Sequence, residues 1–425
     1  MITLKNIREN KDTICEKLVL KSYDIRRIEE ILKKDLIWRE GVSKVEKLKE
    51  DRNKASKQIS DLKREKKSAE DIIIEMQRVS SEIKNIDSNN IDIKNEIDRM
   101  LLDIPNISHT SVPEGKDENS NKVIKSWGEK PEFDFSIESH IDIANKLKLI
   151  DFKAGSRMSG SGFPVYINLG ARLERSLINF MLDHHIGNGY MEIFPPFLVA
   201  RDSMETTGQL PKFMDDMYHI KKDDLFCIPT AEVPVTNFYK GQEIDETLFP
   251  INFVAYSACF RREAGSYGKD TRGLLRLHQF NKVELVKFTK PDSSYDELEL
   301  LLNDAEKILQ ILGLHYRVIE LCTGDLSFSA AKCYDIEVWS PFEEKYLEVS
   351  SCSNFESFQS RRGNIRYRSS DSGKMEFPHT LNGSGVATPR LMVSLLESYQ
   401  QKDGTIQLPE ALYKYFNEKY IGLDV

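Results

Sequence analysis

The sequence predicts an α+β protein: a long antiparallel α-helical hairpin, a coiled coil, precedes a domain built on an antiparallel β-sheet with surrounding helices. Two observations support this prediction. Residues 26–102 contain no proline and one glycine, Gly41, and their apolar residues recur at alternating steps of four and three. Beyond about residue 130, short β-branched or aromatic runs follow one another, mostly without a helix long enough for a parallel crossover.

The apolar positions of residues 26–102 form a coiled-coil seam with one polar position. Its second half is Ile72, Met76, Val79, Ile83, Ile86, Asn90, Ile93, Ile97 and Met100, and its first half is Ile31, Trp38, Val45, Leu48, Ala55, Ile59 and Leu62. We expect two helices of about 33 residues, each ~50 Å long, that fold back at the charged residues 63–70. A dimerising coiled coil, or a charged helix that only faces water, is the alternative interpretation.

Changes in composition divide the chain into three parts. Residues 1–102 form the helical arm, residues 103–130 a linker rich in turn-forming residues, and residues 131–425 the larger domain. In that domain we expect strands at 190–194, 253–260, 278–288, 316–320, 334–338 and 346–351, and helices at 169–187, 295–312 and 389–400.

Composition and charge exclude several classes of protein. With 425 residues, 40% of them hydrophobic, the chain can bury a sizeable core, and we expect a cytoplasmic protein because no secretory signal or membrane-length apolar run is present. Six cysteines without a CxxC pair argue against a zinc finger. The net charge of -8 argues against a protein that coats nucleic acid, but residues 44–67 hold ten Lys or Arg and five Asp or Glu, a local balance of +5.

The densest group of polar, chemistry-bearing residues lies between Phe260 and Leu285. Arg261 and Glu263 are two apart at the end of an expected strand, and Arg276, Phe280 and Glu284 are spaced by four on the next, so each set shares a face. A solvent-facing charged hairpin is the alternative, but such a hairpin would not need phenylalanine on its polar face. Because neither GxxxxGK[ST] nor a strand-linked GxGxxG is present, phosphate would have to be bound by side chains.

These segments resemble class II aminoacyl-tRNA synthetases and, among them, seryl-tRNA synthetases. Motif 2 is matched by FRREAGSYGKDTRGLLRLHQF from Phe260, motif 1 by GYMEIFPPFL from Gly189, and motif 3 by LNGSGVATPRLMVSLLES from Leu381. PTAEVP from Pro229 and EVSSCSNFESFQSRR from Glu348 resemble signatures of the serine-specific enzymes, and the helical arm and linker match as well. The resemblance covers essentially the whole chain.

The resemblance implies an ATP site with Mg²⁺. Arg261 would hold the α-phosphate, Glu263 would read adenine, and Phe280 and Arg390 would cover its two faces, with Arg390 neutralising the far phosphates. Glu348 and Ser351 match the Mg²⁺ positions, as oxygen ligands suit a hard cation. The catalytic set is Arg261, Glu348 and Arg390, and the ATP-binding set is Arg261, Arg262, Glu263, Arg276, Phe280, Glu348, Val349, Ser350, Ser351 and Arg390.

Serine would be recognised by a second set of residues. The resemblance places Glu284 and Ser384 at the hydroxyl with Thr380 close by, and Thr230 and Glu232 at the ammonium group. A pocket that hydrogen-bonds the hydroxyl rejects analogues without it, because its own buried groups would lose their partner. The full serine-binding set is Thr230, Ala231, Glu232, Arg261, Glu284, Thr380, Asn382 and Ser384.

The expected activity is therefore that of a homodimeric serine–tRNA ligase with L-serine, ATP and tRNA(Ser) as partners; charging of tRNA(Sec) stays open. The arm would contact tRNA phosphates through Lys54, Lys57, Lys63 and Arg64. A catalytically silent or carrier-loading synthetase paralogue is the alternative. Pro389 stands where the family usually has glycine, and we expect the motif 3 helix to begin there, since proline is tolerated in a first turn.

Overall fold

The computed structural model describes residues 2–264 and 272–422. The chain divides into two compact units, residues 2–105 and 106–425. The middle of the motif 2 segment, residues 265–271, lies outside the described residues.

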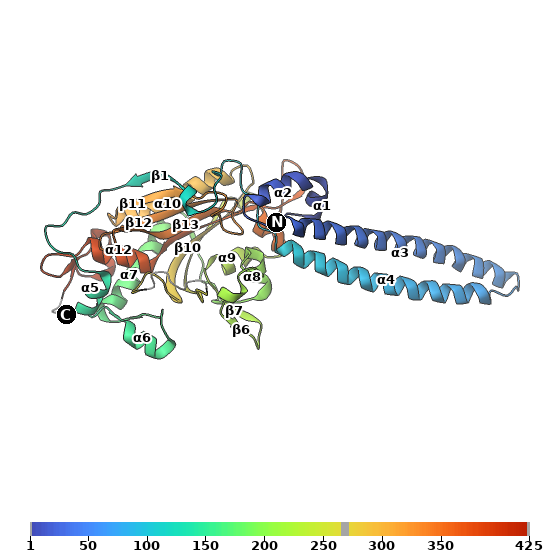
Figure 1. The fold of residues 1–425 in the computed structure, drawn as a ribbon, viewed down its shortest axis with the longest axis horizontal. Helices are drawn as coiled ribbons and strands as arrows, with labels where there is room; N and C mark the ends of the chain where they lie inside the picture. The colour runs from blue at the N-terminus through green and yellow to red at the C-terminus, as the bar shows by residue number, and fades with distance from the viewer. Residues whose placement is uncertain (1, 265–271, 423–425) are drawn as a thin grey trace. The chain divides into compact units, whose positions relative to one another are not determined.

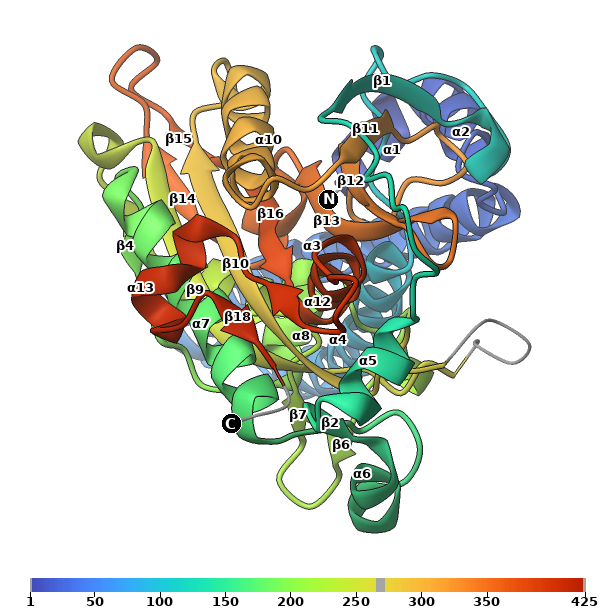
Figure 2. The ribbon, with the colours of Figure 1, turned by 90° about the vertical axis from the view of Figure 1, so that its left-hand side faces the viewer.

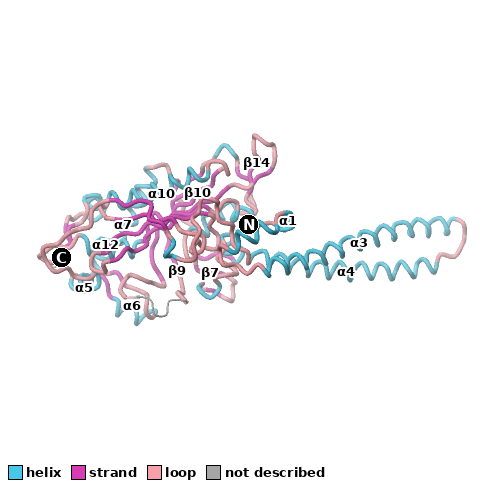
Figure 3. The backbone as a smooth tube through the Cα atoms, turned by 45° about the horizontal axis from the view of Figure 1, so that its top comes forward, coloured by secondary structure: helices cyan, strands magenta, loops and turns pink. Residues whose placement is uncertain are grey.

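The N-terminal unit is helical. Helices α1 (Leu4–Glu9) and α2 (Lys11–Val19) precede the two long helices α3 (Arg26–Arg64) and α4 (Glu70–Leu102), which run side by side as an antiparallel hairpin (Figures 1 and 3). Every residue of the predicted seam is buried or partly buried, and Val45, Val79 and Ile83 form a cluster within it. The predicted hairpin is confirmed, and the turn falls at residues 65–69.

The polar position of the seam lies against the single glycine of the hairpin. Asn90 is buried, and a Cβ atom on Gly41 would lie 2.2 Å from Asn90 Oδ1. A side chain at position 41 would therefore overlap the amide. The glycine that weakens α3 as an isolated helix provides space for the one polar residue of the seam.

The larger unit is built on an eight-stranded sheet in the order β1-β11-β12-β13-β16-β10-β9-β4, antiparallel except for the β4–β9 pair. Its strands are β1 (Lys122–Trp127), β4 (Met191–Glu192), β9 (Ile251–Phe260), β10 (Gln279–Thr289), β11 (Tyr316–Glu320), β12 (Lys332–Ser340), β13 (Lys345–Asn354) and β16 (His379–Ala387). The short strands of the smaller sheets are β2 (Ile150–Asp151), β3 (Val165–Tyr166), β5 (Leu198–Ala200), β6 (His219–Ile220), β7 (Leu225–Cys227), β8 (Glu243–Ile244), β14 (Arg366–Arg368), β15 (Met375–Glu376), β17 (Ile406–Gln407) and β18 (Tyr420–Ile421).

Helices α7, α10 and α12, seen in Figure 2, pack against this sheet in one shared apolar core. The helices of the unit are α5 (His140–Lys146), α6 (Phe152–Ser159), α7 (Asn168–Gly187), α8 (Arg201–Thr207), α9 (Glu232–Thr236), α10 (Ser294–Ile311), α11 (Phe358–Arg362), α12 (Thr388–Ser398) and α13 (Tyr413–Phe416). The predicted fold class is confirmed in both units.

Strand β10 shows how the sheet separates the core from the site. Val283 and Leu285 belong to the main apolar core, together with side chains of α7, α10 and α12. The alternate residues Phe280 and Lys282 line a cleft on the opposite face. This alternation is the two-residue period of a strand with one buried and one functional face.

Two strands of the large sheet were absent from the sequence prediction. Strand β16 lies between β10 and β13, although its sequence, HTLNGSGVA, contains two glycines and few residues that favour strands. Strand β1 pairs with β11 at the edge, within residues assigned to the linker. All six residues of β1 are exposed, so no period of buried residues marks it in the sequence.

Candidate active site

A cleft of about 730 Å³ opens in the larger unit and gathers most of the residues predicted to bind ATP or serine. It is lined by Thr230, Glu232, Arg261, Glu263, Arg276, Phe280, Glu348, Val349, Ser351, Asn382, Ser384 and Arg390 from the predicted set. They come from α9 and the turn before it, from the parts of motif 2 on either side of residues 265–271, and from β10, β13, β16 and α12. The fold thus concentrates arginines, carboxylates and, from the predicted set, the ring of Phe280 in a single cavity.

Several predicted residues lie behind the wall of the cleft. Glu284 and Thr380 are fully buried, and Ser350 donates to the carbonyl of Ser384 at 2.7 Å. Ala231 belongs to a separate apolar cluster. The Arg262 side chain lies over the ring of Tyr218, 5.8 Å from its centroid, and is not part of the cleft wall.

One end of the cleft is a network of buried carboxylates and amides. Asn382 Nδ2 donates to Glu232 Oε2 at 3.0 Å and to Glu284 Oε1 at 2.8 Å. Thr230 Oγ1 donates to Glu284 Oε2 at 3.0 Å, and Lys282 forms an ion pair with the same carboxylate. Glu284 itself is buried, and it therefore acts on the cleft through the residues that contact it, Asn382, Thr230 and Lys282.

Glu232 is held by a second amide. Gln359 Nε2 donates to Glu232 Oε1 at 2.6 Å, while Gln359 Oε1 accepts from Thr380 Oγ1 at 2.7 Å. Thr380 thus acts on the cleft through Gln359. Burial, reinforced by the nearby charge of Glu284, raises the pKa of Glu232 to about 7, and the Gln359 hydrogen bond opposes the rise. This carboxylate therefore becomes charged near neutral pH and suits a cationic ligand.

The other end of the cleft carries the arginines and the aromatic ring. The Arg261 guanidinium lies 5.1 Å from the ring centroid of Phe280, and its Nε donates to the carbonyl of Pro229 at 3.4 Å. Arg276 Nη2 pairs with Glu263 Oε2 at 2.5 Å. These contacts leave a cationic wall beside a flat ring, the combination that recognises a nucleotide.

The first limb of motif 2 differs from the simple prediction of two facing strands. Strand β9 ends at Phe260, and Glu263 lies beyond it with φ +52°. Arg276 precedes β10 and is not part of a strand, so period-two spacing applies to Phe280 and Glu284 alone. Asp216 fixes the first limb, since its carbonyl and carboxylate accept the N–H groups of Arg262 at 2.9 Å and Ala264 at 3.0 Å.

The helix of motif 3 begins where the sequence predicted. Helix α12 starts at Thr388 with Pro389 in its first turn, and Arg390 lines the cleft. Arg390 Nε donates to the carbonyl of Leu275 at 3.1 Å, and Nη1 donates to the carbonyl of Glu348 at 2.9 Å. Arg390 therefore joins motif 2 to strand β13.

Glu348 and Ser351 share a face because β13 contains a bulge. Residues three apart on a regular strand point to opposite faces. The register with β12 shifts between Ser350, opposite Ile336, and Glu348, opposite Glu337, so Val349 is an additional residue. Both Glu348 and Ser351 then line the cleft, one as a carboxylate and one as a hydroxyl. In the described residues, no group of three or more His, Cys, Asp and Glu could hold a metal by itself.

Sequence reasoning missed Lys282. Its side chain is 7% exposed, lines the cleft and pairs with Glu284. The period-two argument that selected Phe280 and Glu284 applies equally to the residue between them. Gln359 was also missed, because nothing in the sequence relates it to Glu232.

Comparison with known proteins follows the same division of the chain. Residues 1–108 match the model of the seryl-tRNA synthetase N-terminal domain, and residues 216–399 match that of the tRNA synthetase class II core domain (G, H, P, S and T). The serine–tRNA ligase of Chloroherpeton thalassium is 52% identical over 99% of this chain and 100% of its own length. The chain belongs to the seryl-tRNA synthetase family.

Solved structures of this family have the same fold. The seryl-tRNA synthetase from Pyrococcus horikoshii, solved in complex with ATP, is 36% identical, with a TM-score of 0.92 over 99% of each chain. The cytoplasmic serine–tRNA ligase from Naegleria fowleri, in complex with AMP, is 27% identical, with a TM-score of 0.87 over 98% of this chain and 97% of its own. A relative from Methanosarcina barkeri is 50% identical over 98% of this chain and 97% of its own.

Proposed function

We propose that this protein is a serine–tRNA ligase that activates L-serine with ATP and transfers it to the 3′ end of tRNA(Ser). The observation that supports this most strongly is the single cleft in which a cationic, aromatic end meets a buried carboxylate network. That pairing fits an amino acid beside a nucleotide. The full-length identity of about half to serine–tRNA ligases supports the same conclusion.

The first step forms seryl-adenylate. An oxygen of the serine carboxylate attacks the α-phosphorus of ATP, and the bond to pyrophosphate breaks. Because two anions must approach, Arg261 would hold the α-phosphate and Arg390 and Arg276 the remaining phosphates. Arg276 Nε is buried and has no hydrogen-bond partner among the described residues, so a phosphate oxygen would satisfy it.

Glu263 would read adenine and Phe280 would stack on it, with Arg390 over the other face. In the structure, Arg261 covers Phe280 and Arg276 pairs with Glu263. ATP would therefore replace these contacts with its own: both arginines would turn toward phosphate, and Glu263 would accept a hydrogen bond from adenine.

The residues on strand β13 fit a Mg²⁺ ion bound together with ATP. Glu348 and Ser351 offer two hard oxygen donors on one face, and Mg²⁺ usually takes one or two protein ligands with phosphates and water. When bound, the ion would neutralise phosphate charge during the attack.

Serine would bind at the carboxylate network. Glu232 would take the ammonium group with Thr230, and Glu284 and Ser384 would serve the hydroxyl. Thr380 would act through Gln359, and Asn382 would stand between the two carboxylates. Because Glu232 and Glu284 are buried, a ligand that lacks a matching donor would leave an unsatisfied group. This cost favours serine over alanine.

Transfer to tRNA and assembly complete the proposal. The exposed basic residues of the arm, Lys54, Lys57, Lys63 and Arg64, would contact tRNA phosphates. We further propose a cytoplasmic homodimer joined through motif 1, where the large apolar side chains of Met191, Phe194 and Leu198 are exposed. Charging of tRNA(Sec) is an extension that the same aminoacylation assay would examine.

The test is amino-acid-dependent exchange of labelled pyrophosphate into ATP with each of the twenty amino acids, followed by charging of tRNA(Ser). Exchange with serine alone and acceptance of serine by tRNA(Ser) are expected. A silent paralogue would give no exchange, and a carrier-loading paralogue would exchange but leave tRNA uncharged.

A further inference from the structure

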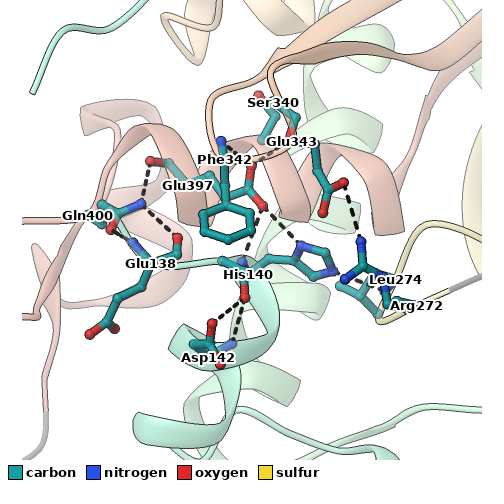
Figure 4. Close-up of polar contacts among 12 residues, drawn as sticks. Glu138, His140, Asp142, Arg272, Leu274, Ser340, Phe342, Glu343, Glu397 and Gln400 are labelled. Carbon is teal, nitrogen blue, oxygen red and sulfur yellow. Dashed lines mark hydrogen bonds and ion pairs between the residues drawn. The ribbon is translucent and has the colours of Figure 1, made fainter. Parts of the chain in front are cut away.

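A buried histidine and a buried glutamate link helix α12 to motif 2 outside the set of residues described above. His140 begins α5 and Glu397 lies in the last turn of α12, and both are 0% exposed. Glu397 Oε1 accepts from His140 Nδ1 at 3.0 Å and from the His140 backbone N–H at 3.2 Å. Its Oε2 accepts from Ser340 Oγ at 2.5 Å and from the Phe342 N–H at 3.3 Å. The carboxylate is thereby fixed by two segments of the chain, the start of α5 and residues 340–342 (Figure 4).

The second nitrogen of His140 contacts the returning limb of motif 2, defined here as residues 272–277. The backbone N–H of Leu274 lies 3.3 Å from His140 Nε2. Because an amide N–H can only donate, Nε2 is the acceptor and Nδ1 carries the proton donated to Glu397. Figure 4 shows the imidazole between the Glu397 carboxylate and Leu274.

Gly273 permits this contact. It has φ +58°, and a Cβ atom at this position would lie 2.2 Å from His140 Nε2. Any side chain there would displace either the imidazole or the limb. The glycine is thus required by the close approach of the limb to His140 and by its own backbone conformation.

The returning limb forms part of the cleft wall, since Leu274, Leu275, Arg276 and Leu277 all line it. Helix α12 holds this limb at two adjacent residues. Arg390 donates to the carbonyl of Leu275, and Glu397 acts through His140 on the N–H of Leu274. Arg390 and Glu397 are seven residues apart, two helical turns, and therefore lie on the same face of α12.

We propose that His140, oriented by Glu397, is a positioning residue that sets the returning limb of motif 2 so that Arg276 faces ATP. This inference rests on the proposed function, because it assigns the limb to ATP. The serine end of the cleft is built on α9, β10 and β16, whereas the hydrogen bonds of the His140 ring among the described residues go to Glu397 and Leu274. Loss of the His140–Leu274 hydrogen bond should therefore weaken ATP binding and leave serine binding nearly unchanged.

Two substitutions at position 140 separate the two nitrogens. In His140→Asn the amide nitrogen can replace Nδ1 as donor to Glu397, but no atom reaches the place of Nε2. In His140→Gln the longer side chain can bring its oxygen to the Leu274 N–H. In serine-dependent pyrophosphate exchange, we expect the asparagine variant to raise KM for ATP about tenfold, the effect of one buried hydrogen bond. KM for serine should stay within about twofold, and glutamine should restore KM for ATP to within about threefold of wild type.

A matched control and a second variant keep the result decisive. His315→Asn changes a histidine that contacts Gly128 and Tyr346 outside the cleft and should alter neither KM. Gly273→Ala tests the limb with His140 retained and should raise KM for ATP selectively, because the methyl group would meet Nε2. The proposal is overturned if wild-type enzyme exchanges pyrophosphate and the asparagine and alanine variants either keep normal KM values or raise both in parallel. Absence of exchange in the wild type would instead contradict the proposed function.

Discussion

Asn382 holds two buried carboxylates at once, with its Nδ2 3.0 Å from Glu232 Oε2 and 2.8 Å from Glu284 Oε1. Each N–H of the amide donates to one carboxylate, so the two negatively charged groups have a donor between them. Asn382→Ala would leave two buried acceptors unsatisfied and increase their repulsion. We expect KM for serine to rise about 10- to 100-fold in pyrophosphate exchange, and KM for ATP to change less than about threefold.

The control for this substitution is Asn121→Ala. The Asn121 amide donates to Asp325 at 2.7 Å and does not belong to the cleft wall. It should leave both KM values unchanged. Equal rises of the two KM values in Asn382→Ala would mean that the amide supports the whole cleft and has no specific role in serine binding.

The raised pKa of Glu232 predicts how serine binding depends on pH. Burial, with the charge of Glu284, raises this pKa to about 7, so the carboxylate is protonated below that pH and charged above it. Only the charged form attracts the serine ammonium group. KM for serine should therefore rise about tenfold for each pH unit below 7, while KM for ATP stays nearly constant.

Exchange kinetics between pH 5.5 and 8.5 would measure this dependence. Glu232→Gln cannot ionise, and its KM for serine should be high at every pH and free of the rise below 7. A wild-type KM for serine that is flat across the range would show that another group binds the ammonium.

Glu174 predicts a pH dependence of stability. It is buried on α7, and its Oε1 accepts from Thr388 Oγ1 at 2.5 Å and Asn281 Nδ2 at 2.8 Å, while Oε2 has no partner among the described residues. Burial raises its pKa to about 7, against the effect of both hydrogen bonds. Its stabilising contribution is present below its unfolded-state pKa and is lost as pH rises through about 7.

Glu174→Gln should reduce this loss, because glutamine resembles the protonated acid. The wild type should lose on the order of 2–3 kcal/mol of unfolding free energy from this group between pH 4.5 and 8. Thermal unfolding of the two proteins at several pH values measures the difference. Parallel Tm curves would mean that Glu174 keeps a pKa near its ordinary value in the fold.

The elements predicted best are those whose side chains alternate between water and core. The seam of α3 and α4 was found from its periodicity, and the strand of residues 316–320 from a short run of β-branched and aromatic residues. Strand β16 was missed because its glycine-rich sequence has little preference for the strand conformation. It forms a strand because it pairs with β10 on one side and β13 on the other. At Gly383 the glycine accommodates Leu301 and Cys352, whose side-chain atoms would lie 3.0 to 3.3 Å from a Cβ.

The residues that form the site were predicted better than their arrangement in space. Motif resemblance identified Glu348 and Ser351, but their spacing of three would have placed them on opposite faces, and the bulge at Val349 is a property of the pairing with β12. Thr380 and Glu284 were expected to serve serine; the structure buries both, and they contact residues of the cleft through Gln359, Asn382 and Thr230. The hydrogen bonds Gln359–Glu232, His140–Leu274 and His140–Glu397 join residues more than 100 positions apart, and no local pattern in the sequence indicates such contacts.

The arm predicts a separation between the two steps of the reaction. Lys63 and Arg64 are exposed at the end of α3, and their side chains would bind RNA phosphates with release of counterions. Lys63→Ser with Arg64→Ser should raise KM for tRNA(Ser) several-fold and reduce the slope of its logarithm against log salt by about one for each phosphate that the arm no longer binds. Serine-dependent pyrophosphate exchange should be unchanged, because the substituted residues do not line the cleft.

The control is Lys5→Ser with Lys33→Ser. These residues are also exposed in the N-terminal unit, and the double substitution makes the same change in net charge and should leave KM for tRNA unchanged. If both pairs weaken charging equally, tRNA responds to the total charge of the unit and not to a specific interaction at the end of α3; if exchange falls as well, the arm supports the catalytic unit itself.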